Sequence, residues 1–219
     1  MFKALKQKIA TFIHKPVTVL QPKEFVPFDL MVGSHLKIDT NSHVIYKSHC
    51  TIPNTNTVTS IGTCVLGGAK AFRFYFNNSH FLQVIINQNK QIEECRLFTL
   101  IDVVYPSTMV AWDMWLNDGK GRIGSFEFKL DYNDLVYTRM SSWADDELDW
   151  VPPVTFTEVI KGANEVSITH QAMSYGRWLN EDRGIAEYLL VSSDSSQHEE
   201  NICTYIGIDV NLNEVITYF

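Results

Sequence analysis

Arg73, Gln83 and Glu93 are the polar residues whose spacing most resembles a binding site. They lie in three consecutive segments, AFRFYF (71–76), HFLQVIIN (80–87) and QIEECRLF (91–98), that read as strands of an antiparallel meander. Symmetric turns would pair Arg73 with Gln83 and Gln83 with Cys95, with Glu93 one pleat along. This register places Arg73, Gln83 and Glu93 on one face, either as a solvated ion pair or as a recognition surface.

A second candidate site lies between residues 135 and 150. Tyr137 and Arg139 share one face of a predicted strand, where a cation–π or packing contact between them is the simpler interpretation. Trp143 and Trp150 flank the acid-rich stretch WADDELDW. Exposed tryptophans there would anchor a basic protein partner, whereas folded-back indoles would join the core. The same stretch, residues 141–153, is a candidate boundary between subdomains.

Metal and covalent chemistry have little support in the sequence. His35, His43, His49 and Cys50 are spaced unlike any standard ligand set. The four cysteines form no CxxC pair and are expected to be reduced thiols. GxSxG, HExxH and dinucleotide motifs are absent from the sequence. We therefore expect no metal, no cofactor and a non-enzymatic role, with an enzyme of unrecognised site as an alternative.

Residues 1–15 differ in kind from the rest of the chain. Phe2, Leu5, Ile9 and Phe12 recur at helical spacing among four lysines and no acid. This pattern predicts a short amphipathic helix, followed by a proline-containing linker over residues 16–29. The helix could dock on its own acidic domain, on a partner helix or on an anionic membrane surface.

The remaining pattern predicts a mainly β body over residues 30–219. A bulge is expected near Glu93–Glu94, and residues 111–116 fit either a strand or a short helix. Further strands are expected at 126–130, 135–140, 166–172 and 215–219, and a long hairpin from 187–192 and 202–209. His170 falls on an apolar face and is expected in the core. The predicted fold is a set of antiparallel meanders and hairpins forming a sandwich or a barrel, as one domain or two subdomains.

Composition narrows the class of protein. The chain has 219 residues, 45% of them hydrophobic, which is ample for a core. Its formal charge of −7 argues against a general nucleic-acid binder. No apolar run reaches the ~20 residues of a transmembrane helix. We expect a cytoplasmic protein, with peripheral contact at the inner membrane as an option.

Several segments in this order resemble the YjfK-type family of bacterial proteins, itself of unknown function. They are IGTCVLGG, FRFYF, FLQVI, IEECRLF, AWDMWL…GRIGSFEF and LVYTRM. The resemblance implies a shared fold and no assigned activity. Its members tend to be encoded near phage-shock-A-like membrane-stress proteins, which implies a membrane-stress context. A binding or scaffold protein with a protein partner is the expected function. A deep apolar pocket lined by Arg or Tyr would instead favour a small-molecule-binding module.

Overall fold

The computed structural model describes residues 25–38, 47–51, 56–76, 79–131, 134–140, 148–196 and 199–218. The predicted N-terminal helix, with Phe2, Leu5, Ile9 and Phe12, lies outside these residues, as do His43 and Trp143. The elements in chain order are η1 (Pro27–Asp29), β1 (His35–Ile38), β2 (Asn56–Leu66), β3 (Ala69–Phe76), β4 (His80–Ile86), β5 (Ile92–Val104), α2 (Met109–Leu116), β6 (Glu127–Lys129), β7 (Val136–Arg139), β8 (Val154–Lys161), β9 (Glu165–Asn180), β10 (Ile185–Ser195), β11 (Glu200–Asp209), η2 (Leu212–Glu214) and β12 (Val215–Tyr218).

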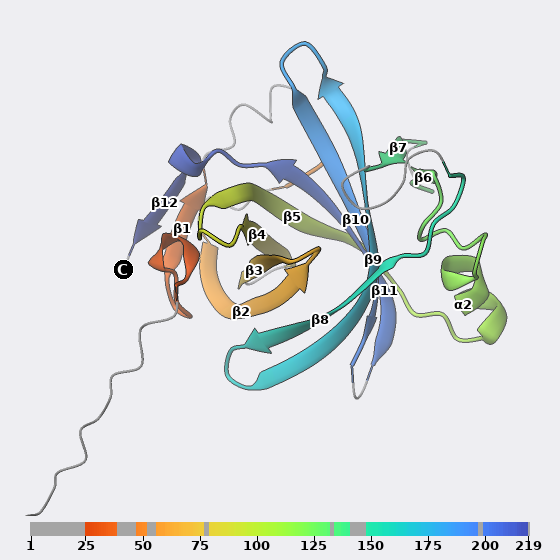
Figure 1. The fold of residues 1–219 in the computed structure, drawn as a ribbon, viewed down its shortest axis with the longest axis horizontal. Helices are drawn as coiled ribbons and strands as arrows, with labels where there is room; N and C mark the ends of the chain where they lie inside the picture. The colour runs from red at the N-terminus through yellow and green to blue at the C-terminus, as the bar shows by residue number, and fades with distance from the viewer. Residues whose placement is uncertain are drawn as a thin grey trace, which may run out of the picture.

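The strands form one antiparallel sheet that closes into a barrel of eight strands (Figure 1). Its order is β2-β3-β4-β5-β11-β10-β9-β8, and β8 pairs back to β2. β1 and β12 extend the sheet from β2, and β7 and β6 extend it from β9. The predicted mainly β, antiparallel, barrel-like fold is confirmed. Strands on either side of residues 141–153 pair with each other, because β2 meets β8 and β5 meets β11.

The barrel wall has an apolar outer face on one side. Phe72, Phe74 and Phe76 point outward from β3, and Phe74 is fully buried, as the alternation predicted. They pack with Leu82, Val84 and Ile86 of β4 under η1, β1 and β12. Alternation along a strand then sends Arg73 and Tyr75 into the barrel interior.

A second apolar cluster lies beneath α2. Figure 1 shows α2 on the side of the barrel opposite β1 and β12. Residues 111–116 belong to α2, so the helical alternative for AWDMWL is confirmed. The helix begins after Thr108, whose side chain accepts a hydrogen bond from Ala111 N. Trp112 and Trp115 pack against the buried residues beneath it, including Phe128 of β6. The long hairpin of β10 and β11 is also confirmed.

The register of the meander agrees with prediction on one side only. Arg73 pairs with Gln83 and Phe74 with Leu82, as symmetric β3–β4 pairing requires. Gln83, however, pairs with Arg96, so the predicted pairing with Cys95 is wrong. The cause is the expected bulge: Ile85 pairs with Glu94 and Ile86 with Ile92, leaving Glu93 unpaired.

Candidate functional site

A buried ion-pair network occupies the centre of the barrel. Arg73 Nη1 donates to Glu158 Oε2 at 2.8 Å, and Arg73 Nε donates to Gln83 Oε1 at 3.0 Å. Tyr75 donates its hydroxyl hydrogen to Glu158 Oε1 at 2.8 Å. The acid that meets Arg73 is therefore Glu158 of β8. The predicted grouping with Glu93 is wrong, because the bulge leaves Glu93 exposed.

Gly62 of β2 makes room for this network. It pairs with Arg73 on one side and with Ile160 on the other. A Cβ atom at this position would lie 1.6 Å from Glu158 Oε1. Glycine is therefore required here for space, since any side chain would displace the buried carboxylate.

His170 extends the network to β9 and β10. Its Nε2 lies 3.1 Å from Glu158 Oε2, and its Nδ1 lies 2.7 Å from Asp194 Oδ1 and 3.2 Å from Ser192 Oγ. A serine nucleophile and its orienting acid must meet opposite ring nitrogens in a catalytic triad. Ser192 and Glu158 do lie on opposite nitrogens, but Ser192 Oγ donates its hydrogen to Asp194 Oδ1, and both Ser192 and His170 are buried. The arrangement therefore does not present an activated, accessible serine. The expected burial of His170 is confirmed.

The charges of the network alternate and stabilise one another. Burial alone would raise the pKa of Glu158, but Arg73, His170 and Tyr75 lower it below its usual value. Burial alone would lower the pKa of His170, but hydrogen bonds to Asp194 and Glu158 raise it. Both shifts favour the charged form of the group. The barrel centre is an internally neutralised core.

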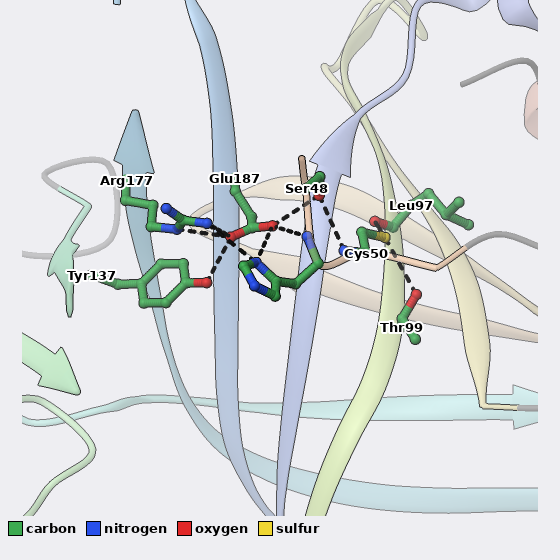
Figure 2. Close-up of polar contacts among 8 residues, drawn as sticks. Ser48, Cys50, Leu97, Thr99, Tyr137, Arg177 and Glu187 are labelled. Atoms are coloured by element: carbon green, nitrogen blue, oxygen red, sulfur yellow. Dashed lines mark hydrogen bonds and ion pairs between the residues drawn. The ribbon is translucent and has the colours of Figure 1, made fainter. Parts of the chain in front are cut away.

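A second buried carboxylate, Glu187, lies on the outer face of β10 (Figure 2). It accepts hydrogen bonds from Ser48 Oγ at 2.8 Å, His49 N at 2.6 Å and Tyr137 OH at 2.7 Å. Arg177 Nε donates to it at 2.8 Å. Burial would raise the pKa of Glu187, and these donors lower it instead. The carboxylate therefore fastens residues 47–51 to the barrel wall.

Tyr137 and Arg139 share one face of β7, as predicted, but each of them contacts other residues. Tyr137 and Arg139 are both buried. Arg177, rather than Arg139, has its guanidinium over the Tyr137 ring, at 5.4 Å, while Arg139 lies 5.8 Å from the Phe126 ring. Arg139 Nη1 donates to Gly124 O at 2.8 Å. The predicted contact between Tyr137 and Arg139 is thus replaced by tertiary contacts.

Trp150 folds onto the loop after α2. Its Nε1 donates to Gly121 O at 3.0 Å, and the side chain is half-buried. Of the residues considered as metal ligands, His35 lies beside Thr57, and Cys50 Sγ lies near Thr99 Oγ1. Within the described ranges no three His, Cys, Asp or Glu side chains are grouped to hold a metal ion.

A second group of charged side chains, partly accessible to solvent, lies at one end of the barrel, where β2, β4 and β11 finish. Arg96 Nη1 lies 2.7 Å from Glu94 Oε2, and Arg96 Nε donates to Asp209 Oδ1 at 3.0 Å. Tyr188 donates its hydroxyl hydrogen to Asp209 Oδ2 at 2.6 Å, and Arg96 stacks on its ring at 4.0 Å. Glu93 is exposed beside them.

Two cavities open at this end. One, of about 330 Å³, is lined by Glu93, Glu94, Arg96, Tyr188 and Asp209 among others. The other, of about 280 Å³, has apolar walls of Leu66, Ala69, Ile85 and Val154, and it shares Glu93 and Glu94 with the first. We call this surface, formed by Glu93, Glu94, Arg96, Asp209 and the two cavities, the acidic end.

Comparison with known proteins identifies one family, whose function is unknown. A family model described as a protein of unknown function (DUF2491) matches residues 1–215. No curated protein and no solved structure matches the chain. Among the described residues, no helix is long and apolar enough to cross a membrane.

Proposed function

The chain belongs to the DUF2491 family of proteins of unknown function, and we propose that it is a non-enzymatic binding protein that captures a basic segment of a protein partner at the acidic end. One observation carries this proposal. Glu93 and Glu94 line both cavities at that end, whereas the charges at the barrel centre are buried and paired with one another. Accessible acidic side chains and accessible space therefore coincide at the acidic end.

The electrostatics of the acidic end select a cationic partner. Arg96 is the cation among the lining residues, and it already bridges Glu94 and Asp209. The lining residues include three acids, Glu93, Glu94 and Asp209, against this one cation. An added lysine or arginine would therefore meet a net negative field. Glu93, one of the residues predicted to bind, lies at this surface.

The apolar cavity indicates which uncharged side chains the partner segment should contain. Its walls suit an aliphatic side chain or the methylene stem of a lysine, whose ammonium would stay near Glu93 and Glu94. A segment in which basic and apolar residues alternate on a helix has this chemistry. The resemblance to YjfK-type proteins supports a partner in a membrane-stress context, and hence a cytoplasmic protein acting at the inner membrane.

Fluorescence anisotropy with a labelled amphipathic peptide of lysine and leucine tests the proposal on the full chain. Replacing both Glu93→Gln and Glu94→Gln should weaken binding roughly five- to thirtyfold, because each lost rim charge removes about 0.5–1 kcal/mol. The control is Glu165→Gln, an exposed acid paired with Lys161, which should bind like the wild type. Equal affinity for the double variant and the control would refute the proposal.

A small organic amine is the second candidate ligand. The stack of Arg96 on Tyr188 at 4.0 Å lines a cavity of about 330 Å³, which lies in the size range of small-molecule sites. Titration with lysine amide distinguishes the two candidates. Binding as tight as that of the peptide favours the small molecule, and binding weaker by tenfold or more favours the protein segment.

A further inference from the structure

We propose that residues 1–15 of the same chain are a resident occupant of the acidic end, so that a partner binds only by displacing them. This inference rests on the proposed function, because it names a competitor for the same site. It makes the protein self-regulated: its binding surface is covered at rest and is uncovered when residues 1–15 leave.

Residues 1–15 and the acidic end have complementary charge and hydrophobicity. Residues 1–15 contain Lys3, Lys6, Lys8 and Lys15 and no acid, while the rest of the chain holds 14 basic and 25 acidic side chains. Their apolar residues recur at helical spacing, so one face could fill the apolar cavity while lysines meet Glu93 and Glu94. Lysines and apolar residues at helical spacing are the features that the acidic end is proposed to bind.

The described chain starts close to the acidic end. The described chain begins at Phe25, and the Lys90 ammonium lies 5.7 Å from the centre of its ring. Lys90 belongs to the tight turn between β4 and β5, where its N–H donates to Asn87 O. Glu93 follows that turn by only three residues. The chain that connects residues 1–15 to the barrel therefore joins it at Phe25, beside the acidic end.

The connecting residues 16–24 are long enough for residues 1–15 to reach the acidic end. Residues 16–24 can span at most about 30 Å when extended, and a helix of residues 1–15 would be about 22 Å long. The turn at Lys90 lies within this range of Phe25. The exposed apolar face of α2, where Met109 is 78% and Met114 60% exposed, is the rival docking surface. It lies across the barrel from η1 and β1 (Figure 1) and is therefore less accessible to this tether.

A tethered occupant competes strongly even when its own affinity is low. A short flexible connection gives an effective concentration on the order of 1 mM. An intrinsic dissociation constant of about 100 μM would then leave the acidic end about nine-tenths covered and weaken partner binding about tenfold. Salt should reverse the effect, since it screens lysine–carboxylate attraction.

The first experiment locates residues 1–15 in the full chain. A carbodiimide joins lysine amines to carboxylates that are in contact, and mass spectrometry identifies the linked pairs. We expect links from the lysines of residues 1–15 to Glu93 or Glu94, lost in 1 M salt. An equal mixture of unlabelled and ¹⁵N-labelled chains should give links within one chain. Links to Asp113 of α2, or links only between chains of different mass, would overturn the inference.

The second experiment measures competition. Replacing the four lysines by glutamine in the full chain should raise its affinity for the lysine–leucine peptide about tenfold, because the occupant is lost. The control replaces the exposed Lys120 and Lys161 by glutamine, which should change little. Unchanged affinity in the four-lysine variant overturns the inference alone if peptide binding still requires Glu93 and Glu94. If the peptide binds neither chain while the links to Glu93 or Glu94 form, the location of residues 1–15 at the acidic end is supported, and the proposed function and the displacement by a partner are refuted.

Discussion

Replacing Glu158 by glutamine should destabilise the barrel far more than the loss of one hydrogen bond. The side chain is fully buried and meets Arg73 at 2.8 Å, Tyr75 at 2.8 Å and His170 at 3.1 Å. Glutamine keeps the shape but removes the charge, so two buried cations lose their shared partner. Breaking a buried ion pair in this way costs about 3–5 kcal/mol. Urea denaturation monitored by tryptophan fluorescence gives the free energy of unfolding.

Two comparisons make this prediction decisive. Glu165→Gln breaks an exposed pair with Lys161, separated by 3.7 Å, and should cost less than about 1 kcal/mol. Adding Arg73→Met to Glu158→Gln removes both charges, so the double variant should be more stable than the sum of the single losses predicts, by about 2 kcal/mol or more. A loss below about 1 kcal/mol for Glu158→Gln would refute the view that the network carries buried charge.

Three further predictions concern the buried carboxylates Glu158 and Glu187 and the histidine beside Glu158. Gly62→Ala should lower the free energy of unfolding by about 1–3 kcal/mol in the same assay, because its Cβ would overlap Glu158; unaltered stability would mean that the carboxylate lies elsewhere. Tyr137→Phe removes one donor to Glu187 and should cost about 1.5–3 kcal/mol, while a neutral effect would argue against that hydrogen bond. The pKa of His170 is raised above its usual 6.5, so its stabilisation is complete below pH 6.5 and is lost as the pH rises through the folded-state value. A series of denaturation curves upward from pH 6 should show that slope in the wild type and a flatter profile in His170→Gln.

Features that depend on residues close together in the sequence, such as the faces of a strand and the register of a hairpin, are predictable from the sequence. Alternation places Phe74 and Arg73 on opposite faces of the strand, and symmetric β3–β4 pairing places Arg73 opposite Gln83. The expected solvated face or recognition surface is wrong for these two residues, because the closed barrel buries Arg73 and Gln83. The bulge at Glu93 was expected from the broken alternation of the third strand, but its effect on register was not. One extra residue sends every later side chain to the other face, so Arg96 faces Gln83 in place of Cys95.

The principal buried acids were missed for a different reason. Glu158 and Glu187 meet Arg73 and Tyr137 from strands that are distant in sequence. No local periodicity encodes which strands a closing barrel brings together. Glu158 does lie in an alternating stretch, VTFTEVIK, so its parity carried a weak signal. The choice of partner required the closure of β8 onto β2.

That closure also has a consequence for synthesis on the ribosome. β5 ends at Val104, but its barrel neighbour β11 begins only at Glu200. Translation at about 5–20 residues per second separates their emergence by roughly 5–20 s. During this interval the β2–β5 meander presents unpaired strand edges and the phenylalanines of its apolar face. We therefore expect a ribosome-associated chaperone to bind the nascent chain during this interval. Slower translation of residues 105–199 should increase aggregation of the chain when such chaperones are depleted.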